Sequence, residues 1–372
     1  MAELLVKQTW HLRLLTPIHI GCGETLWHDF DWVTAGKETL VLDKDRIWEA
    51  ALPEEEDAPL DLGLLRRPPA QLVDQEELGA DSPFVLYRLR GTPRGEEVLA
   101  QTKNAWRQPY IPGSSLKGAI RTVLLWEAVR TGRVQVQEAD MDRRRERAAQ
   151  KIEQQAFGSD PNHDLLRALR VGDSRPLSLE ALRLLNVYVF SSGGGDQGQR
   201  IPINVEAISH NQETSAPVTI DGYLLREPSL GFEARADWLT SELPDIARRW
   251  ASYQLGSEAE FYRMRGWQRP LTYVQKLMGA LNRLSGRAFL LQFGWGTGWG
   301  AKTIGPLLPA ELRDRVIQRY RLSLGRHSPG APFPRSRRLR GRLGTHGSDP
   351  DYPLGWVRVR ITDSVRLQER GA

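Results

Sequence analysis

The chain is poor in the residues from which several common kinds of site are built. Its 372 residues include a single cysteine, Cys22, which excludes a disulfide framework and a cysteine-rich zinc site. No apolar run approaches the length needed to cross a bilayer, and the N-terminal residues lack the pattern of a secretory signal. We therefore expect no membrane partner and a cytoplasmic location.

The familiar nucleotide-binding loops are also missing. A Walker loop places its lysine directly after a glycine, whereas Lys117 precedes Gly118. The stretch from Gly294 has Trp299 where a dinucleotide-binding turn needs its third glycine. Ser114-x-x-Lys117 matches the serine motif of some acyl-transfer enzymes, but the companion Ser-Asp-Asn and Lys-Thr-Gly motifs are absent from the sequence. We predict neither a cofactor nor a metal.

Charge is distributed unevenly along the chain. The net charge is +5, but residues 49–81 are acidic, whereas residues 321–343 hold seven arginines and no acid. This asymmetry indicates a polyanionic partner on one side. Because the arginines are interleaved with proline and glycine, we expect 321–343 to be a mobile basic arm that contacts phosphates, with Arg337 and Arg338 among the contacts. Twelve tryptophans supply rings that can stack on bases, although most such rings pack in cores.

The most informative stretch, residues 109–122, predicts an extended segment, a sharp turn and then a helix. Pro112 keeps the residue before it out of the α region, and Gly113 supplies the turn. Ser114 or Ser115 is expected to be the N-cap of the helix.

Two cations, Lys117 and Arg121, lie one turn apart on this predicted helix. They repel each other mildly, and an anion beside them relieves that strain. The free amides from Gly113 to Ser115 and the dipole of the helix start favour the same charge. Gly118 removes side-chain bulk where a backbone could approach closely. We predict a phosphate site here; the alternative is a capped helix with solvated charges.

Two further loops are suited to the same kind of ligand. Residues 16–24 place Gly21 and Gly23 around Cys22, and His19 is a candidate ligand contact, although a lone histidine beside apolar residues is more often structural. Residues 294–303 carry glycine at every second position, which leaves amides open to an anion unless the loop is a hairpin with its tryptophans tucked inward. The candidate contacts in this loop are Gly296, Thr297, Gly298, Trp299 and Lys302.

We expect two α+β domains. The first covers residues 1–200, with a variable insertion at about 50–105, and the second covers 201–372. The glycine-rich stretch 191–199 predicts a flexible connection at the boundary. The main elements expected outside the motifs are a strand over 4–15, an antiparallel strand pair over 201–208 and 217–225, helices over 244–263 and 270–284, and strands over 287–293 and 356–361.

The three motifs and their order resemble the RAMP superfamily of CRISPR-associated RNA-binding proteins. Residues 110–122 are similar to its signature, 16–24 to its N-terminal motif and 294–303 to its glycine-rich loop. Together with Asp173-Ser174 and the closing Pro353-Leu354-Gly355-Trp356, the pattern is similar to the fifth-subunit family of type III-A, or Csm, effector complexes.

This resemblance implies an RRM-like, or ferredoxin-like, fold of antiparallel sheets, packed helices and large insertions. It also implies a non-catalytic RNA-binding subunit that caps the complex at the end holding the 3′ part of the CRISPR RNA (crRNA). Such a subunit contributes to assembly, crRNA 3′-end maturation and antiviral defence. The implied partners are crRNA, target RNA, the repeated backbone subunit and the small helical subunit.

Two enzymatic alternatives stay open. One is a RAMP endoribonuclease that processes precursor crRNA, with His19 as general acid or base. The other is a target-RNA-cleaving backbone subunit that uses Asp29 or Asp31 with magnesium, although nearby carboxylates are more often turn and cap residues.

Overall fold

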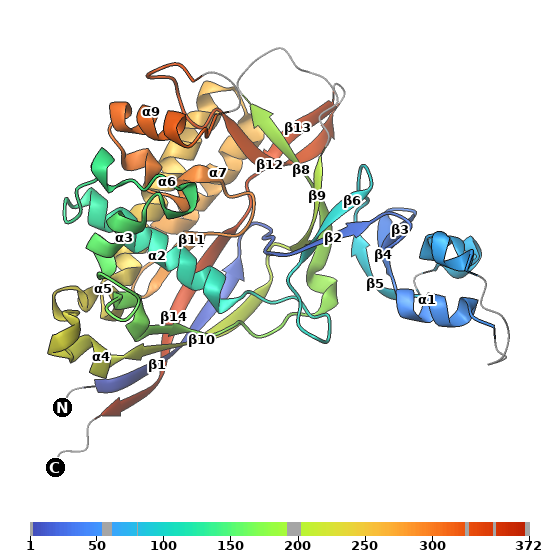
Figure 1. The fold of residues 1–372 in the computed structure, drawn as a ribbon, viewed down its shortest axis with the longest axis horizontal. Helices are drawn as coiled ribbons and strands as arrows, with labels where there is room; N and C mark the ends of the chain where they lie inside the picture. Colours follow the sequence, from blue (N-terminus) through green and yellow to red (C-terminus); the bar gives the residue numbers. More distant parts are fainter. Residues whose placement is uncertain are drawn as a thin grey trace.

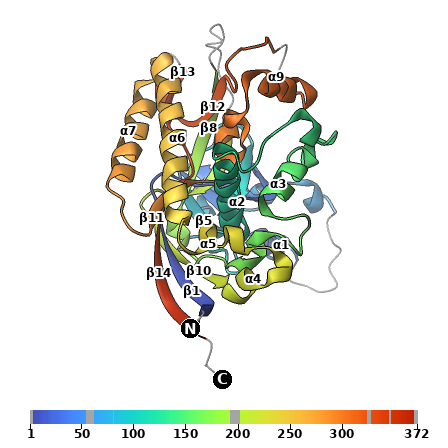
Figure 2. The same ribbon diagram turned by 90° about the vertical axis from the view of Figure 1, so that its left-hand side faces the viewer.

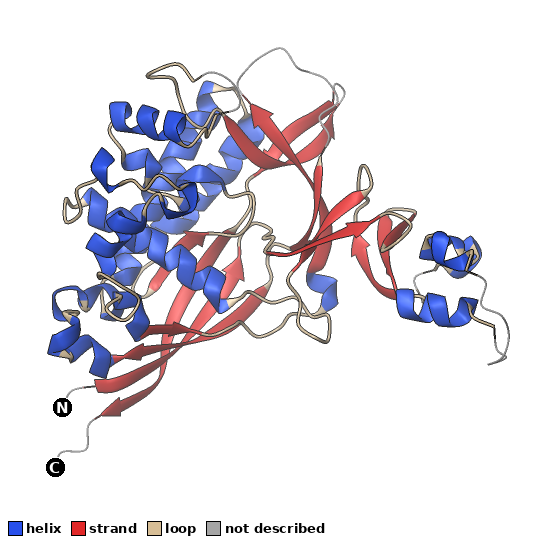
Figure 3. Ribbon diagram, in the orientation of Figure 1, coloured by secondary structure: helices blue, strands red, loops and turns tan. Residues whose placement is uncertain are grey.

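The computed structural model describes residues 3–53, 62–79, 81–191, 202–323, 327–344 and 347–368. These parts of the chain form two β-sheets and a layer of helices (Figure 1, Figure 3). The class is α+β, as the sequence predicted.

The strands are β1 (Glu3–Leu14), β2 (Gly21–Trp27), β3 (Trp32–Ala35), β4 (Glu38–Leu42), β5 (Val85–Arg90), β6 (Glu97–Gln101), β7 (Leu169–Val171), β8 (Leu182–Ser191), β9 (Ile203–Ile208), β10 (Glu213–Asp221), β11 (Ala288–Gln292), β12 (Ser336–Gly344), β13 (Gly347–Tyr352) and β14 (Trp356–Gln368). The α-helices are α1 (Lys44–Ala51), α2 (Gly113–Arg130), α3 (Gln150–Phe157), α4 (Gly222–Arg226), α5 (Asp237–Thr240), α6 (Leu243–Met264), α7 (Gln268–Asn282), α8 (Gly298–Lys302) and α9 (Ala310–Arg319).

The five-stranded sheet has the order β11-β14-β1-β10-β7, and each neighbouring pair is antiparallel. Strand β1 lies at its centre. The alternation seen in the sequence buries Trp10, Leu12 and Leu14, while His11 and Arg13 stay partly exposed on the other face. The predicted first and closing strands are therefore confirmed, and they pair with each other although they lie at opposite ends of the chain.

Helices α2, α6 and α7 lie on one side of the molecule (Figure 2). In α6, buried residues such as Ala247, Trp250 and Ala251 recur at helical spacing, and Pro244 stands in the first turn, where a proline costs no hydrogen bond. Trp250 packs against Trp356 of β14, with ring centroids 6.1 Å apart. The predicted helices over 244–263 and 270–284 are confirmed as α6 and α7.

The nine-stranded sheet runs β2-β6-β9-β8-β5-β4-β3, with β12 and β13 added through β8. Its pairs β5–β8 and β6–β9 are parallel, and the other pairs are antiparallel. The end formed by β3 and β4, together with α1, lies farthest from the helical layer (Figure 1). Strands β5 and β6 belong to this sheet although they fall within the segment 50–105 that we expected to be an insertion.

Two predictions about strands are wrong. Strands β9 and β10 do not pair with each other: β9 pairs with β8 and β6, and β10 pairs with β1 and β7. The predicted mobile arm contains β12, which pairs with β8 and β13. Leu339 and Gly341 of β12 are buried. Successive residues of a strand point to opposite faces, so Arg338 and Arg342 lie on the exposed face. The high arginine content is therefore compatible with a strand.

Both sheets contain strands from either side of residue 200. The predicted flexible connection at 191–199 lies, apart from its first residue, outside the described residues. A domain boundary near residue 200 stays a prediction. Within the described ranges, no helix combines the length and the apolar character needed to span a bilayer.

Gly355 stands where three segments meet. Its amide donates to the Pro17 carbonyl at 2.9 Å, and its carbonyl accepts from the Phe293 amide at 3.1 Å. Its φ is +82°, and a Cβ atom there would lie 2.2 Å from the Phe293 carbonyl oxygen. Only glycine combines this backbone angle with this close approach.

We predict that Gly355→Ala lowers the free energy of unfolding by about 3 kcal/mol, because it adds a backbone clash to the left-handed strain. Gly36→Ala is the matched control: its φ is +60°, but nothing lies within 4 Å of the added atom. The control should lose only about 1 kcal/mol. Urea unfolding of both variants measures the difference, and equal losses would contradict the close packing described here.

Candidate nucleic-acid interface

A groove with a volume of about 340 Å³ lies between α2, the N-terminal loop (residues 15–20, before β2) and the glycine-rich loop (residues 293–297, before α8). The three sequence motifs thus come together in one place. The groove is lined by Ile20, Gly21, Ser115, Gly118, Ala119, Thr122, Gln292, Phe293, Gly294, Trp295, Ala301 and Lys302.

The two loops are joined through their backbones. The Trp295 amide donates to the His19 carbonyl oxygen at 2.8 Å. Gly294 has a φ of +94°, and a Cβ atom there would lie 2.8 Å from the same oxygen. Glycine is needed at position 294 because the two loops pack this closely. The Trp295 amide already has its hydrogen-bond partner within the protein.

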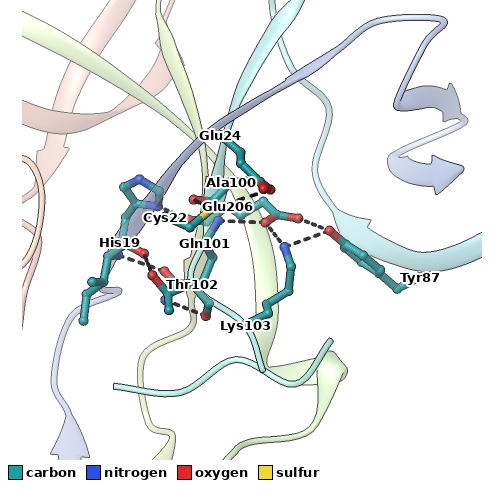
Figure 4. Close-up of polar contacts among 10 residues, drawn as sticks. His19, Cys22, Glu24, Tyr87, Ala100, Gln101, Thr102, Lys103 and Glu206 are labelled. Carbon is teal, nitrogen blue, oxygen red and sulfur yellow. Dashed lines mark hydrogen bonds and ion pairs between the residues drawn. The ribbon is translucent and has the colours of Figure 1, made fainter. Parts of the chain in front are cut away.

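A buried carboxylate supports the N-terminal loop through Gln101 (Figure 4). Glu206 is fully buried and forms an ion pair with Lys103. Its carboxylate also accepts hydrogen bonds from the Tyr87 hydroxyl at 2.6 Å and from the backbone amide of Gln101 at 2.8 Å. The side chain of Gln101 in turn accepts from the Ile20 amide at 2.9 Å. Burial, and then the charge of Glu206, raise the pKa of the Tyr87 phenol, so it stays protonated and donates.

His19 lies behind the groove. Its side chain is 1% exposed, and Nδ1 lies 2.6 Å from the carbonyl oxygen of Glu206. Because a carbonyl only accepts, Nδ1 carries the proton. Burial lowers the pKa of His19, which keeps the ring neutral near pH 7. The ring packs edge-to-face against Trp295 with centroids 5.8 Å apart, so His19 positions Trp295, whereas the sequence suggested a ligand contact.

The predicted cation pair does not face the groove. Arg121 forms ion pairs with Glu153 at 2.7 Å and Asp164 at 2.8 Å, and its guanidinium lies over the Phe157 ring at 4.5 Å. Each residue of a helix is rotated by about 100° from the one before it. Arg121 therefore points away from the side of α2 that lines the groove and towards α3. Burial lowers the pKa of Lys117, whose side chain has no hydrogen bond or ion pair with another described residue.

The start of α2 is also occupied from within the protein. The N-cap is Pro112 and makes no side-chain cap, so the predicted serine cap is wrong. The Gly113 amide donates to Asp173 Oδ1 at 2.8 Å, and this carboxylate takes the place of the anion that we expected at the helix start. Ser114 is exposed, whereas Ser115 lines the groove.

One further cation, Lys302, lines the groove, and a second, Arg338, lies beside it. Lys302 ends α8, and its side chain makes no hydrogen bond or ion pair with the part of the chain that the structure describes. Desolvation in the groove, and then the charge of Arg338, lower the pKa of Lys302. The Arg338 guanidinium lies 5.3 Å from the centroid of the Trp295 ring. Lys302, Arg338 and Trp295 therefore form a cationic wall with one aromatic face.

Other predicted contacts have structural roles. Arg337 pairs with Glu258 at 2.8 Å and stacks over Phe261 at 3.7 Å. Trp299 packs edge-to-face on Phe333 with centroids 5.0 Å apart. The remaining positions in the two loops shape the backbone: Gly23, Gly296 and Gly298 have φ values of +93°, +81° and +88°, and the Thr297 hydroxyl donates to the Gly294 carbonyl at 3.1 Å.

The paired aspartates form a turn. Asp31 Oδ1 pairs with Lys44 at 2.6 Å and Asp31 Oδ2 accepts from the Trp27 amide at 2.8 Å, while Asp29 has a φ of +63°. The described ranges contain no group of three or more histidine, cysteine, aspartate or glutamate side chains placed to hold a metal ion.

Of the two glycines in the signature motif, Gly113 is closely packed, whereas Gly118 has open space where a side chain would lie. It lies inside α2, faces the groove, and would place a Cβ atom with nothing within 4 Å. A glycine inside a helix costs about 1 kcal/mol relative to alanine. Packing within the described residues does not explain this cost.

The fold and the convergence of these motifs define the class of the protein. The model of the RAMP superfamily matches residues 11–301, and the chain belongs to that superfamily. This confirms the α+β RAMP fold expected from the sequence.

Within the superfamily, the chain is similar to the CRISPR system Cms protein Csm5 of Streptococcus thermophilus, with 28% identity over 270 residues, 64% of this chain and 73% of the relative. It superposes on a chain of the Csm–crRNA–target RNA ternary complex of a type III-A CRISPR-Cas system with a TM-score of 0.71 and 26% identity, covering 97% of this chain and 100% of that one. The crystal structure of T. onnurineus Csm5 gives a TM-score of 0.64 at 23% identity, covers 93% of this chain and 99% of that one, and supports the fold.

We predict that stability depends on the neutral state of His19. Because burial holds its folded pKa below the ordinary value of 6.5, the unfolded chain takes up the proton first, and stability falls as pH drops below about 6.5. Relative to His19→Asn, the wild type should lose up to about 1.4 kcal/mol per pH unit. Urea unfolding from pH 7.5 down to 5 measures this loss. A constant difference between the two proteins would show that His19 is not held neutral.

Proposed function

We propose that this chain is a non-catalytic RNA-binding subunit of a type III-A CRISPR effector complex, with crRNA, target RNA and other Csm subunits as partners. The observation that carries the proposal is the groove where the three RAMP motifs meet beside an open helical glycine. The similarity to a chain of the Csm–crRNA–target RNA complex, which extends over 97% of this chain, supports the same setting.

In this proposal the groove holds the sugar-phosphate backbone of the RNA. Gly118 lets the strand approach α2, and Ser115 offers a hydroxyl from the same helix face, whereas the Thr122 hydroxyl donates to the Gly118 carbonyl at 3.1 Å. Lys302 neutralises a phosphate, and Trp295 offers a ring on which a base can stack. Recognition of this kind depends on the backbone and on stacking, so it tolerates sequence changes in the guide.

The geometry favours holding RNA over cutting it. A general acid or base must reach the reacting groups, but His19 is buried, neutral and bonded to the Glu206 carbonyl. Both oxygens of the Asp31 carboxylate are bonded within the protein, one to the Trp27 amide and one to Lys44. Incubation of the purified protein with repeat RNA, with and without magnesium, tests this directly. Specific cleavage that is lost in His19→Ala would favour the endoribonuclease.

We also infer a place at the end of the complex that holds the 3′ part of the crRNA, next to the repeated backbone subunit and the small helical subunit. There the chain contributes to assembly, to crRNA 3′-end maturation and to antiviral defence. The match to the full length of the similar chain in the Csm complex supports a corresponding position. Subunit stoichiometry of the native assembly decides between one capping copy and a repeated subunit.

We predict opposite effects of Gly118→Ala on folding and on RNA binding. The added methyl stabilises α2 by about 1 kcal/mol but fills the surface that the RNA approaches, and should weaken binding by about tenfold. Gly256→Ala is the matched control, because Gly256 also lies inside a helix with open space around it but does not line the groove. Thermal melts and RNA titrations measure both effects, and equal RNA affinity of the two variants would oppose the proposal.

We predict that Lys302→Gln/Arg338→Gln weakens RNA binding about tenfold and lowers the slope of log affinity against log salt by about 1.4, since each lost phosphate contact removes about 0.7. Arg263→Gln/Arg283→Gln removes the same charge from exposed ends of α6 and α7 and should leave both quantities nearly unchanged. Fluorescence anisotropy over a salt series separates the two variants. If both variants lose affinity and salt slope to the same extent, the effect comes from the net charge and not from the groove.

A further inference from the structure

The face of the five-stranded sheet opposite the buried one carries a basic surface that the groove does not include. In register, His11 of β1 lies opposite Arg360 of β14, and Arg13 lies opposite Arg358. Residues directly opposite in an antiparallel pair point to the same face. They surround a hollow with a volume of about 390 Å³. We call this surface the arginine face; it comprises His11, Arg13, Arg175, Glu213, Arg358 and Arg360.

The charges on the arginine face are not balanced. Glu213 is its one carboxylate and pairs with Arg13 at 3.4 Å. Arg175, Arg358 and Arg360 have no ion-pair partner among the residues that the structure describes, and Arg175 and Arg360 are exposed. Like charges directly opposite each other on neighbouring strands are destabilising. Glu213 offsets the charge of Arg13, whereas Arg358 opposite it has no counter-ion among the described residues.

The position of Arg175 is fixed by the sheet edge. Its amide donates to the Ser215 carbonyl at 2.8 Å, and its carbonyl accepts from the Thr214 hydroxyl at 2.6 Å. Two residues earlier, Asp173 binds the first amide of α2. This short segment therefore connects the start of α2, which borders the groove, with the arginine face. The two sites share no lining residue.

The composition of the arginine face suits a nucleic-acid backbone better than a protein surface. Protein–protein interface cores are enriched in aromatic residues as well as in arginine. The arginine face has four arginines and, apart from the His11 ring, no aromatic side chain. Arginine binds phosphate oxygens through paired N–H donors, and its charge is lost at no physiological pH. Positions two residues apart on one strand are about 7 Å apart, so several phosphates of one strand can be bound in succession.

We propose that the arginine face is a second RNA-binding surface, which binds phosphates of a single-stranded RNA segment outside the groove. The proposal rests on the RNA-binding function proposed above. Because no ring other than His11 is available for stacking, this surface recognises the backbone and is insensitive to base sequence. Its contribution to affinity is therefore strongly salt-dependent.

The test compares four variants of the full-length chain by anisotropy with a labelled oligouridine over a salt series: the arginine-face variant, the groove variant, their combination and a charge-matched control. Arg358→Gln/Arg360→Gln should bind about tenfold more weakly and lower the salt slope by about 1.4. Combined with Lys302→Gln/Arg338→Gln, the losses should add, since the surfaces are separate. The charge-matched control is Arg263→Gln/Arg283→Gln, and thermal melts check that each variant is folded.

The outcomes are distinct. If only the groove variant binds weakly, the arginine face does not bind RNA, although the proposed function stands. If Arg358→Gln/Arg360→Gln binds RNA normally but no longer enters a reconstituted complex, the face is a protein interface and the proposal is overturned. If neither surface affects binding, the proposed RNA-binding function fails as well. A lower affinity and a lower salt slope of Arg358→Gln/Arg360→Gln, without loss of stability, support the proposal.

Discussion

The burial of the Glu206 carboxylate is the interaction on which the candidate site depends. This charge is fully removed from water and is matched by Lys103, the Tyr87 hydroxyl and the Gln101 amide. A buried charge that loses one partner costs several kcal/mol, so these groups are held in one arrangement. The same residue offers its backbone carbonyl to His19, and His19 offers its carbonyl to Trp295. Glu206 thus supports both loops of the groove, one link starting at its carboxylate and the other at its backbone carbonyl.

In this arrangement, the residues that support the loops differ from the residues that line the groove. Glu206, Gln101 and Tyr87 are buried and bond to one another behind the loops. In the groove, Gly118 leaves open space and Lys302 has no hydrogen-bond or ion-pair partner among the described residues. Helix α2 shows the same division around its axis: Leu116 and Ile120 pack in the core, Arg121 pairs with α3, and the small residues face the groove. A site built in this way is rigid before its ligand arrives, which lowers the entropic cost of binding.

The sequence predicted those features that depend on short-range patterns. Alternation in β1 and helical spacing in α6 identified the correct elements. Strand partners were not predictable in the same way: β9 and β10 are neighbours in sequence, but they join different sheets because pairing depends on distant segments. The motif residues do converge, but the direction of Arg121 depends on Glu153 and Asp164, which lie far along the chain. Glu206 was missed although an acidic residue inside an apolar strand is a recognisable signal of a buried ion pair.

The central claim is that the groove between α2 and the two loops holds the RNA strand. A cryo-electron-microscopy map of the chain assembled with its complex and guide RNA tests this claim most directly. The account predicts nucleotide density along Gly118 and Ser115, with a phosphate near Lys302 and a base against Trp295. A groove that is filled by a neighbouring protein chain, with the RNA bound elsewhere on the subunit, would contradict it.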